Sequence, residues 1–221
     1  MCRACDTPSV EWRLLAGVSA EDVSRLVAVA QRRTFRDGQV VFHDDDPADA
    51  LHLVVAGHFA VRVMIPTGET VLLAVVGPGD AFGELALISD SRRGATVQAF
   101  SDGETLALHR DAFEVLRRAR PQVDRSLAVI LAERLRRVNE LLMEAHYVDA
   151  DLRVRRRLLE LGDAFDGAIP LTQEEIAQTA GTSRATVNRV LREEEAAGAV
   201  ELGRGRTTIT DAAALRERAT R

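Results

Sequence analysis

The sequence has no lysine: all 29 of its basic residues are arginine. It has only two cysteines, Cys2 and Cys5, which are too close together to join distant parts of a core by a disulfide. No apolar run approaches the roughly 18 residues of a membrane-spanning helix, and no basic-then-apolar signal pattern opens the chain. These absences favour a cytoplasmic protein that does not bind a membrane.

The sequence also gives little support to an enzyme. Motifs of serine hydrolases, P-loop NTPases and zinc proteases are absent. We therefore expect neither catalysis nor a metal site. The net charge of -5 argues against a protein that coats nucleic acid indiscriminately, but it is compatible with a local DNA-binding face. The histidines are scattered without ligand or triad spacing, at His43, His52, His58, His109 and His146.

The 221 residues are enough for two modest cores. Residues from Trp12 to Ala30 have helical spacing, and Ser19 is placed to cap a helix. From Thr34 to Leu108, short β-branched runs alternate with turn residues, which is typical of an antiparallel barrel or jelly roll. The expected strands are Val40–Phe42, Leu51–Val55, Phe59–Ile65, Thr70–Val76, Ala95–Phe100 and Thr105–Leu108.

A single long helix should begin at Pro121 and continue to about Tyr147. Its narrow apolar seam either pairs with a second copy of the chain or packs on the β-roll of the same chain. Residues Tyr147 to Asp149 interrupt the helical pattern and form a candidate hinge, with Asp149 as the cap of the next helix. The seam consists of Leu127, Leu131, Leu135, Val138, Leu142 and Ala145.

The C-terminal region has the pattern of a helix-turn-helix. Thr172 and Glu175 form a capping box, Gly181 supplies a tight turn, and Thr182 or Ser183 caps a second helix. A terminal hairpin around Gly203 to Arg206 then forms a wing. We expect the acidic run Glu193–Glu195 to be a solvated face. The predicted DNA-binding residues are Thr172, Gln173, Ser183, Arg184, Asn188, Arg189, Arg204 and Arg206, of which Arg and Asn suit guanine and adenine edges.

A second candidate site is the loop and short helix between Gly77 and Val97. A helix that starts near Gly83 offers free amides to an anion, and Arg93 supplies the countercharge. The carboxylate of Glu84 suits a ribose hydroxyl. A purely structural Glu84–Arg93 ion pair is the alternative.

With these parts in this order, the chain from Trp12 to Ile209 resembles the Crp/Fnr superfamily, and its catabolite-activator branch in particular. The run Phe82-Gly-Glu-Leu-Ala86, followed by Arg93-Gly-Ala-Thr-Val97, is similar to the phosphate-binding cassette of that family's cyclic-nucleotide sensors. The resemblance implies that Glu84 holds the ribose and Arg93 the cyclic phosphate of an allosteric effector, with cyclic AMP as the first choice. The implied effector-binding residues are Gly83, Glu84, Leu85, Arg93, Gly94, Val138 and Asn139.

Four positions depart from the pattern of the cyclic-AMP-binding members. Gly94 stands where they usually have Ser or Thr at the phosphate. Val138 and Asn139 replace the Thr-Ser pair that contacts adenine across the dimer, although the Asn139 amide can both donate and accept. Ala185 replaces a glutamate of the DNA-reading helix, which should relax or change one base of the half-site.

The resemblance implies an α+β chain with an antiparallel β-roll, a long dimerisation helix and a winged helix-turn-helix. We expect a disordered tail at residues 1–10, an effector domain at 11–120, the dimerisation helix and hinge at 121–148, and the DNA-binding domain at 149–221. The expected partners are double-stranded DNA, a second copy of the chain, a small effector and, for an activator, RNA polymerase. No tightly bound cofactor is expected.

Two alternative hypotheses about function are compatible with this architecture. In one, the protein binds DNA constitutively or responds to a different ligand. In the other, Cys2 and Cys5 make a redox or iron–sulfur sensor of the Fnr branch, although one chain lacks the four thiolates of a conventional cluster. The first would leave DNA binding independent of cyclic nucleotides, and the second would make it depend on oxidation state.

Overall fold

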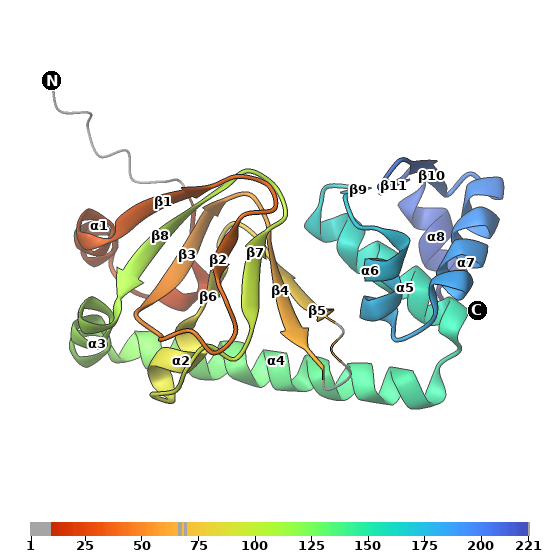
Figure 1. Cartoon of the computed structure of the whole chain (residues 1–221). Helices are drawn as coiled ribbons and strands as arrows, with labels where there is room; N and C mark the ends of the chain where they lie inside the picture. Colours follow the sequence, from red (N-terminus) through yellow and green to blue (C-terminus); the bar gives the residue numbers. More distant parts are fainter. Residues whose placement is uncertain (1–9, 66–67, 69, 221) are drawn as a thin grey trace, which may run out of the picture. The chain divides into compact units, whose positions relative to one another are not determined.

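The computed structural model describes residues 10–65, 68 and 70–220. The predicted tail therefore lies outside the described residues apart from Val10, and so do Cys2 and Cys5. The chain divides into two compact units between Leu135 and Arg136, and each is described by itself (Figure 1).

The first unit contains a β-roll of two four-stranded antiparallel sheets, in the strand orders β1-β8-β3-β6 and β2-β7-β4-β5. The two sheets enclose a cluster of apolar side chains that includes Phe35, Val54, Phe59, Phe82 and Val97. All six expected strands are present, and β1 and β6 are additional. The strands are β1 (Gln31–Phe35), β2 (Val40–Phe42), β3 (Ala50–Ala56), β4 (Phe59–Met64), β5 (Thr70–Val76), β6 (Ala81–Phe82), β7 (Thr96–Ala99) and β8 (Gly103–His109).

Helices cover one sheet of the roll (Figure 1). They are the 3-10 helix η1 (Arg13–Leu15), α1 (Ala20–Val29), α3 (Arg110–Ala119) and the first turns of α4 (Pro121–Tyr147). Ser19 caps α1 as predicted, because its side chain accepts from the Asp22 amide. The short α2 (Glu84–Ile88) follows β6. The core beneath these helices includes Trp12, Leu14, Leu26, Leu51, Leu106, Phe113, Val123 and Leu127.

The long helix α4 has the predicted bounds. Of its apolar seam, Leu127 is buried in the core of the first unit. Leu131, Leu135, Val138 and Leu142 are exposed. Packing on the β-roll of the same chain therefore accounts for the first turns of the seam only.

The second unit holds α5 (Ala150–Ala164), β9 (Ala168–Ile169), α6 (Gln173–Ala180), α7 (Arg184–Ala196), β10 (Val200–Gly203), β11 (Arg206–Ile209) and α8 (Ala212–Arg218). The capping box of Thr172 and Glu175 makes both of its hydrogen bonds, and Gly181 ends α6 in the left-handed conformation. Of the two predicted cap residues, Thr182 and Ser183, it is Ser183 that caps α7. Asp149 is the N-cap residue of α5, but its side chain makes no cap hydrogen bond.

Two predictions for this unit are wrong. The wing hairpin is not the last element, because α8 follows it and is capped by Asp211. The run Glu193–Glu195 is not a uniformly solvated face, since Glu194 is fully buried. Glu194 follows Val190 and Leu191 by four and three residues, so the helical repeat turns it toward the core. There its carboxylate accepts from Nε of Arg155 at 2.6 Å and from Nε of Arg218 at 3.0 Å.

The structure confirms the predicted α+β class, with a β-roll, a long helix and a C-terminal helix-turn-helix. Within the described residues, no helix combines the length and apolarity that a bilayer crossing requires.

Candidate effector site and DNA-binding groove

Gly83 forms the junction between β6 and α2. Its φ of 82° lies in the left-handed region that glycine adopts without strain. A Cβ at this position would lie 2.7 Å from Nη1 of Arg93, so glycine is also required for the close approach of that guanidinium. Leu85, the next but one residue, is half exposed.

Arg93 lies in the loop that precedes β7, and its side chain is buried. Its Nη1 donates to the Gly83 carbonyl at 2.8 Å, and its Nη2 donates to the Ala50 carbonyl at 2.6 Å and to Asp49 at 3.1 Å. The guanidinium carbon lies 4.1 Å from the centre of the Phe42 ring. Nε is buried without a hydrogen-bond partner among the described residues. Burial lowers the pKa of Arg93 from its usual value, and Asp49 opposes this shift.

Glu84 is also buried, and its carboxylate accepts a hydrogen bond from Nη1 of Arg134 on α4. Arg134 in addition donates to the Ala81 carbonyl. The structure thus gives Glu84 and Arg93 different partners, and the alternative of a Glu84–Arg93 ion pair is wrong. Neither Arg134 nor Asp49 was among the predicted site residues.

In the second unit, residues of α6, α7 and the wing line a half-open cavity of about 580 Å³. Five predicted DNA-binding residues line it: Thr172, Gln173, Arg184, Asn188 and Arg206. Asn188 donates to the Gln173 side chain across the cavity at 3.1 Å. Because the lining combines two arginines with two amides, it can meet both phosphate oxygens and base edges.

The remaining predicted DNA-binding residues lie outside this lining. Ser183 accepts from the Thr186 amide as the cap of α7, and Arg204 is exposed in the turn of the wing. Arg189 is on the exposed side of α7 and forms ion pairs with Asp151 and Glu193. Within the described part of the chain, no three His, Cys, Asp or Glu side chains group as metal ligands would.

Each of the two units is similar to a known protein family. Residues 32–120 match the cyclic nucleotide-binding domain, and residues 152–218 match the Crp-like helix-turn-helix domain. The cyclic AMP receptor protein of Thermus thermophilus is 37% identical over 207 residues, which cover 92% of this chain and 95% of that protein. The chain belongs to the Crp/Fnr family of transcriptional regulators.

Two further relatives resemble this Crp/Fnr regulator over nearly its whole length. The CRP-like cAMP-activated global transcriptional regulator of Mycobacterium tuberculosis is 32% identical and covers 93% of this chain and 96% of its own. The crystal structure of Thermus thermophilus catabolite activator protein has a TM-score of 0.56 at 36% identity and covers 94% of this chain and 98% of its own.

The structure brings only part of this Crp/Fnr regulator's predicted effector site together. Gly83 and Arg93 are in direct contact, and Glu84 follows at the start of α2. Gly94 is exposed beside them, and a Cβ there would meet no atom of the described residues within 4 Å. Val138 and Asn139 are exposed on α4, beyond the division between the units. Their contact with an effector stays a prediction.

The sequence does not predict Arg134 and Asp49 as effector-site residues, because neither lies in a local motif. The Arg134–Glu84 pair spans 50 residues of sequence and the Arg93–Asp49 pair 44. The only signal for Arg134 is its place beside the apolar seam of α4, where many arginines occur.

Proposed function

We propose that the protein is a homodimeric regulator that binds a pseudo-palindromic DNA site under the control of a cyclic nucleotide, with cyclic AMP as the first candidate. The observation that supports a cyclic-nucleotide effector is the incomplete charge compensation of Arg93. The side chain of Arg93 is 2% exposed, whereas the side chain of Asp49, which forms the ion pair with it, is 72% exposed. A buried cation with a solvated counter-ion and an unpartnered Nε is incompletely compensated. A cyclic phosphate supplies both the missing charge and the missing acceptor.

Glu84 supports the same assignment. A buried carboxylate next to the Arg93 contact residue Gly83 is suited to accept from a ribose hydroxyl, and the names of the Thermus and Mycobacterium relatives refer to cyclic AMP. To bind ribose, Glu84 has to share or exchange its Arg134 partner. The half-exposed position of Arg134 makes such an exchange possible at low cost.

Calorimetry tests the effector. We expect heat of binding from cyclic AMP with the wild type and at least a tenfold weaker affinity with Arg93→Lys, which keeps the charge but loses the guanidinium fork. Arg92→Ala is the matched control, because Arg92 is the adjacent arginine and pairs at the surface with Asp45. Cyclic GMP is titrated in parallel to test the choice of base. If neither cyclic AMP nor cyclic GMP gives heat of binding with the wild type, the cyclic-nucleotide proposal is refuted.

A second candidate is a regulator that binds DNA without a cyclic nucleotide. The observation that favours it is that Glu84 and Arg93 each have a partner within the chain, so the fold does not require a ligand. Electrophoretic mobility shifts separate the two candidates. Equal affinity for operator DNA with and without cyclic nucleotide supports the second, and nucleotide-dependent affinity supports the first.

The exposed seam of α4 supports the homodimer. Leu135, Val138 and Leu142 follow one another at helical spacing on a single face, and all are more than half exposed. We expect Leu135→Glu to convert a dimer into monomers in sedimentation equilibrium. Leu73→Glu on β5 is the control, since Leu73 and Leu135 are both 63% exposed. A monomeric wild type at micromolar concentration would contradict the dimer.

The same proposal includes how the signal reaches DNA. Ligand changes the register or length of the paired α4 helices around Val138 to Ala145, and the bend at Tyr147 to Asp149 repositions the α7 helices. A separation of about 34 Å lets both enter successive major grooves. We infer that the protein acts in the cytoplasm and, as an activator, contacts RNA polymerase. A DNase footprint without two-fold symmetry would contradict this arrangement.

A further inference from the structure

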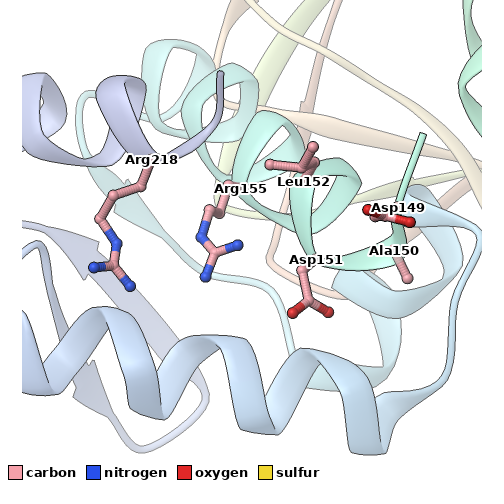
Figure 2. A pocket seen from close by; sticks show the side chains of 6 residues that line it. All are labelled: Asp149, Ala150, Asp151, Leu152, Arg155 and Arg218. Atoms are coloured by element: carbon pink, nitrogen blue, oxygen red, sulfur yellow. The ribbon is translucent and has the colours of Figure 1, made fainter. Parts of the chain in front are cut away.

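Arg189 on α7 is held by carboxylates from two helices. Its Nη1 and Nη2 donate to Oδ2 and Oδ1 of Asp151 at 2.8 and 2.5 Å, and Nη1 also donates to Oε1 of Glu193 at 2.9 Å. Asp151 lies in the first turn of α5, outside the helix-turn-helix. Figure 2 shows its carboxylate directed away from α5, toward the neighbouring helix. Asp151 thus fixes a side chain on the predicted reading face from outside that face.

The remaining donors of Arg189 have a defined geometry. A guanidinium has five N–H groups. Three of these are used by Asp151 and Glu193. The other two, on Nε and Nη2, are parallel, lie on one edge of the plane and have no partner among the described residues. Two parallel donors are what the O6 and N7 acceptors of guanine require.

The charge of this cluster also indicates its role. Arg189 contributes one positive charge, and Asp151 and Glu193 contribute two negative charges, so the group is net negative. Such a group is poorly suited to bind phosphate, whereas a fixed pair of donors suits a neutral base edge. The hydrogen bonds from Arg189 lower the pKa of Asp151, so that its carboxylate is ionised at neutral pH.

We propose that Asp151 is a positioning residue for sequence recognition: it orients Arg189 so that the Nε and Nη2 edge reads a guanine in each half-site. The proposal rests on the proposed function, in which α7 enters the major groove. The orientation reduces the rotamer freedom that Arg189 loses on binding. Position 185, one helical turn before Arg189, is alanine, so α7 supplies no carboxylate on that side.

The test measures discrimination at single base pairs. An operator is selected from a random duplex pool with the wild-type full chain, and Kd values are measured for it and for each single substitution in the half-site. Arg189→Ala identifies the base pair at which discrimination disappears. We expect Asp151→Ala to reduce discrimination about tenfold at that same base pair and to leave the others unchanged. Asp151→Asn, which keeps the shape and one acceptor, should have a smaller effect at the same place.

The control is Asp163→Asn, which removes one charge from an exposed position on the same helix. Tighter binding by Asp151→Ala with discrimination intact would identify Asp151 as a brake that sequesters Arg189, and would overturn the positioning role. Uniform weakening at all base pairs in both Asp151 variants would overturn it as well, because that is the effect of a structural role. If the wild type enriches no inverted repeat, the proposed function itself fails, and the role of Asp151 fails with it.

Discussion

Glu194 provides the most direct test of the packing in the second unit. It is fully buried between α5, α7 and α8 and accepts from Nε of Arg155 and Nε of Arg218. Removing one member of a buried ion pair costs about 3–5 kcal/mol, because the partner charge is left uncompensated. Arg155 keeps Glu193 as a second partner, and Arg218 is partly exposed, so we expect the lower end of that range.

Glu194→Ala should therefore destabilise the second unit by about 3 kcal/mol, which lowers the Tm of a domain of this size by roughly 10–25 °C. Far-UV circular dichroism follows both units. Fluorescence follows only the first, because the single tryptophan, Trp12, is buried there. We expect the variant to move the dichroism transition and to leave the fluorescence transition nearly unchanged.

Glu195→Ala is the matched control for this experiment. Glu195 is the next residue on α7 and pairs at the surface with Arg192, at 2.9 Å. An exposed pair of this kind contributes less than about 1 kcal/mol. Equal shifts of the dichroism transition in Glu194→Ala and Glu195→Ala would refute the reasoning.

Three further predictions concern the first unit. Burial lowers the pKa of His52 to about 3. The unfolded chain binds a proton at His52 below about pH 6.5, and the folded chain does not. We therefore expect the free energy of unfolding to keep the whole contribution of neutral His52 above that pH and to decrease by about 1.4 kcal/mol per pH unit below it. His52→Gln should then lose about 2 kcal/mol less than the wild type between pH 6.5 and pH 5 in urea unfolding followed by Trp12 fluorescence, and equal losses would contradict this. Gly94→Ser, in the open space beside Arg93, should gain one hydrogen bond to a charged phosphate, about 1.5 kcal/mol or tenfold in cyclic AMP affinity by calorimetry, and unchanged affinity would place the phosphate elsewhere. Gly83→Ala should destabilise the unit by at least about 1–2 kcal/mol in the same unfolding assay, because its φ is left-handed and the new Cβ meets Arg93, and wild-type stability would disprove that contact.

The sequence was sufficient for most features that depend on local periodicity. The six expected strands, the bounds of α4 and the caps at Ser19, Thr172 and Ser183 follow from alternation or from residues three positions apart. Strand β1 was missed because its residues Gln31 to Thr34 are exposed and show no alternation. Its pairing with β8, a strand about 70 residues away, makes it a strand.

Glu194 was mispredicted for a different reason. The helical repeat that identified Val187, Val190 and Leu191 as buried also places Glu194 on their face, but the acidic composition of its neighbours favoured solvent. The period was the better indicator, because a helix turns a residue toward the core whatever its charge, and Arg155 on another element supplies the counter-ion. No local pattern identifies that partner.

The exposure of the counter-ions distinguishes the Arg155–Glu194 pair from the two ion pairs of the proposed effector site. In the Arg155–Glu194 pair both side chains are buried, so separating them would leave an unsolvated and uncompensated charge. The pair therefore fixes α5 against α7. In the proposed effector site, each buried charge is paired with a group that reaches solvent: Glu84 with Arg134, and Arg93 with Asp49. Water can solvate the released Arg134 or Asp49, so an incoming ribose or phosphate can take their place at a much smaller cost. A site that exchanges an internal partner for a ligand requires this asymmetry, and it is the physical reason to look for the effector at Arg93 rather than at the better-satisfied Arg155.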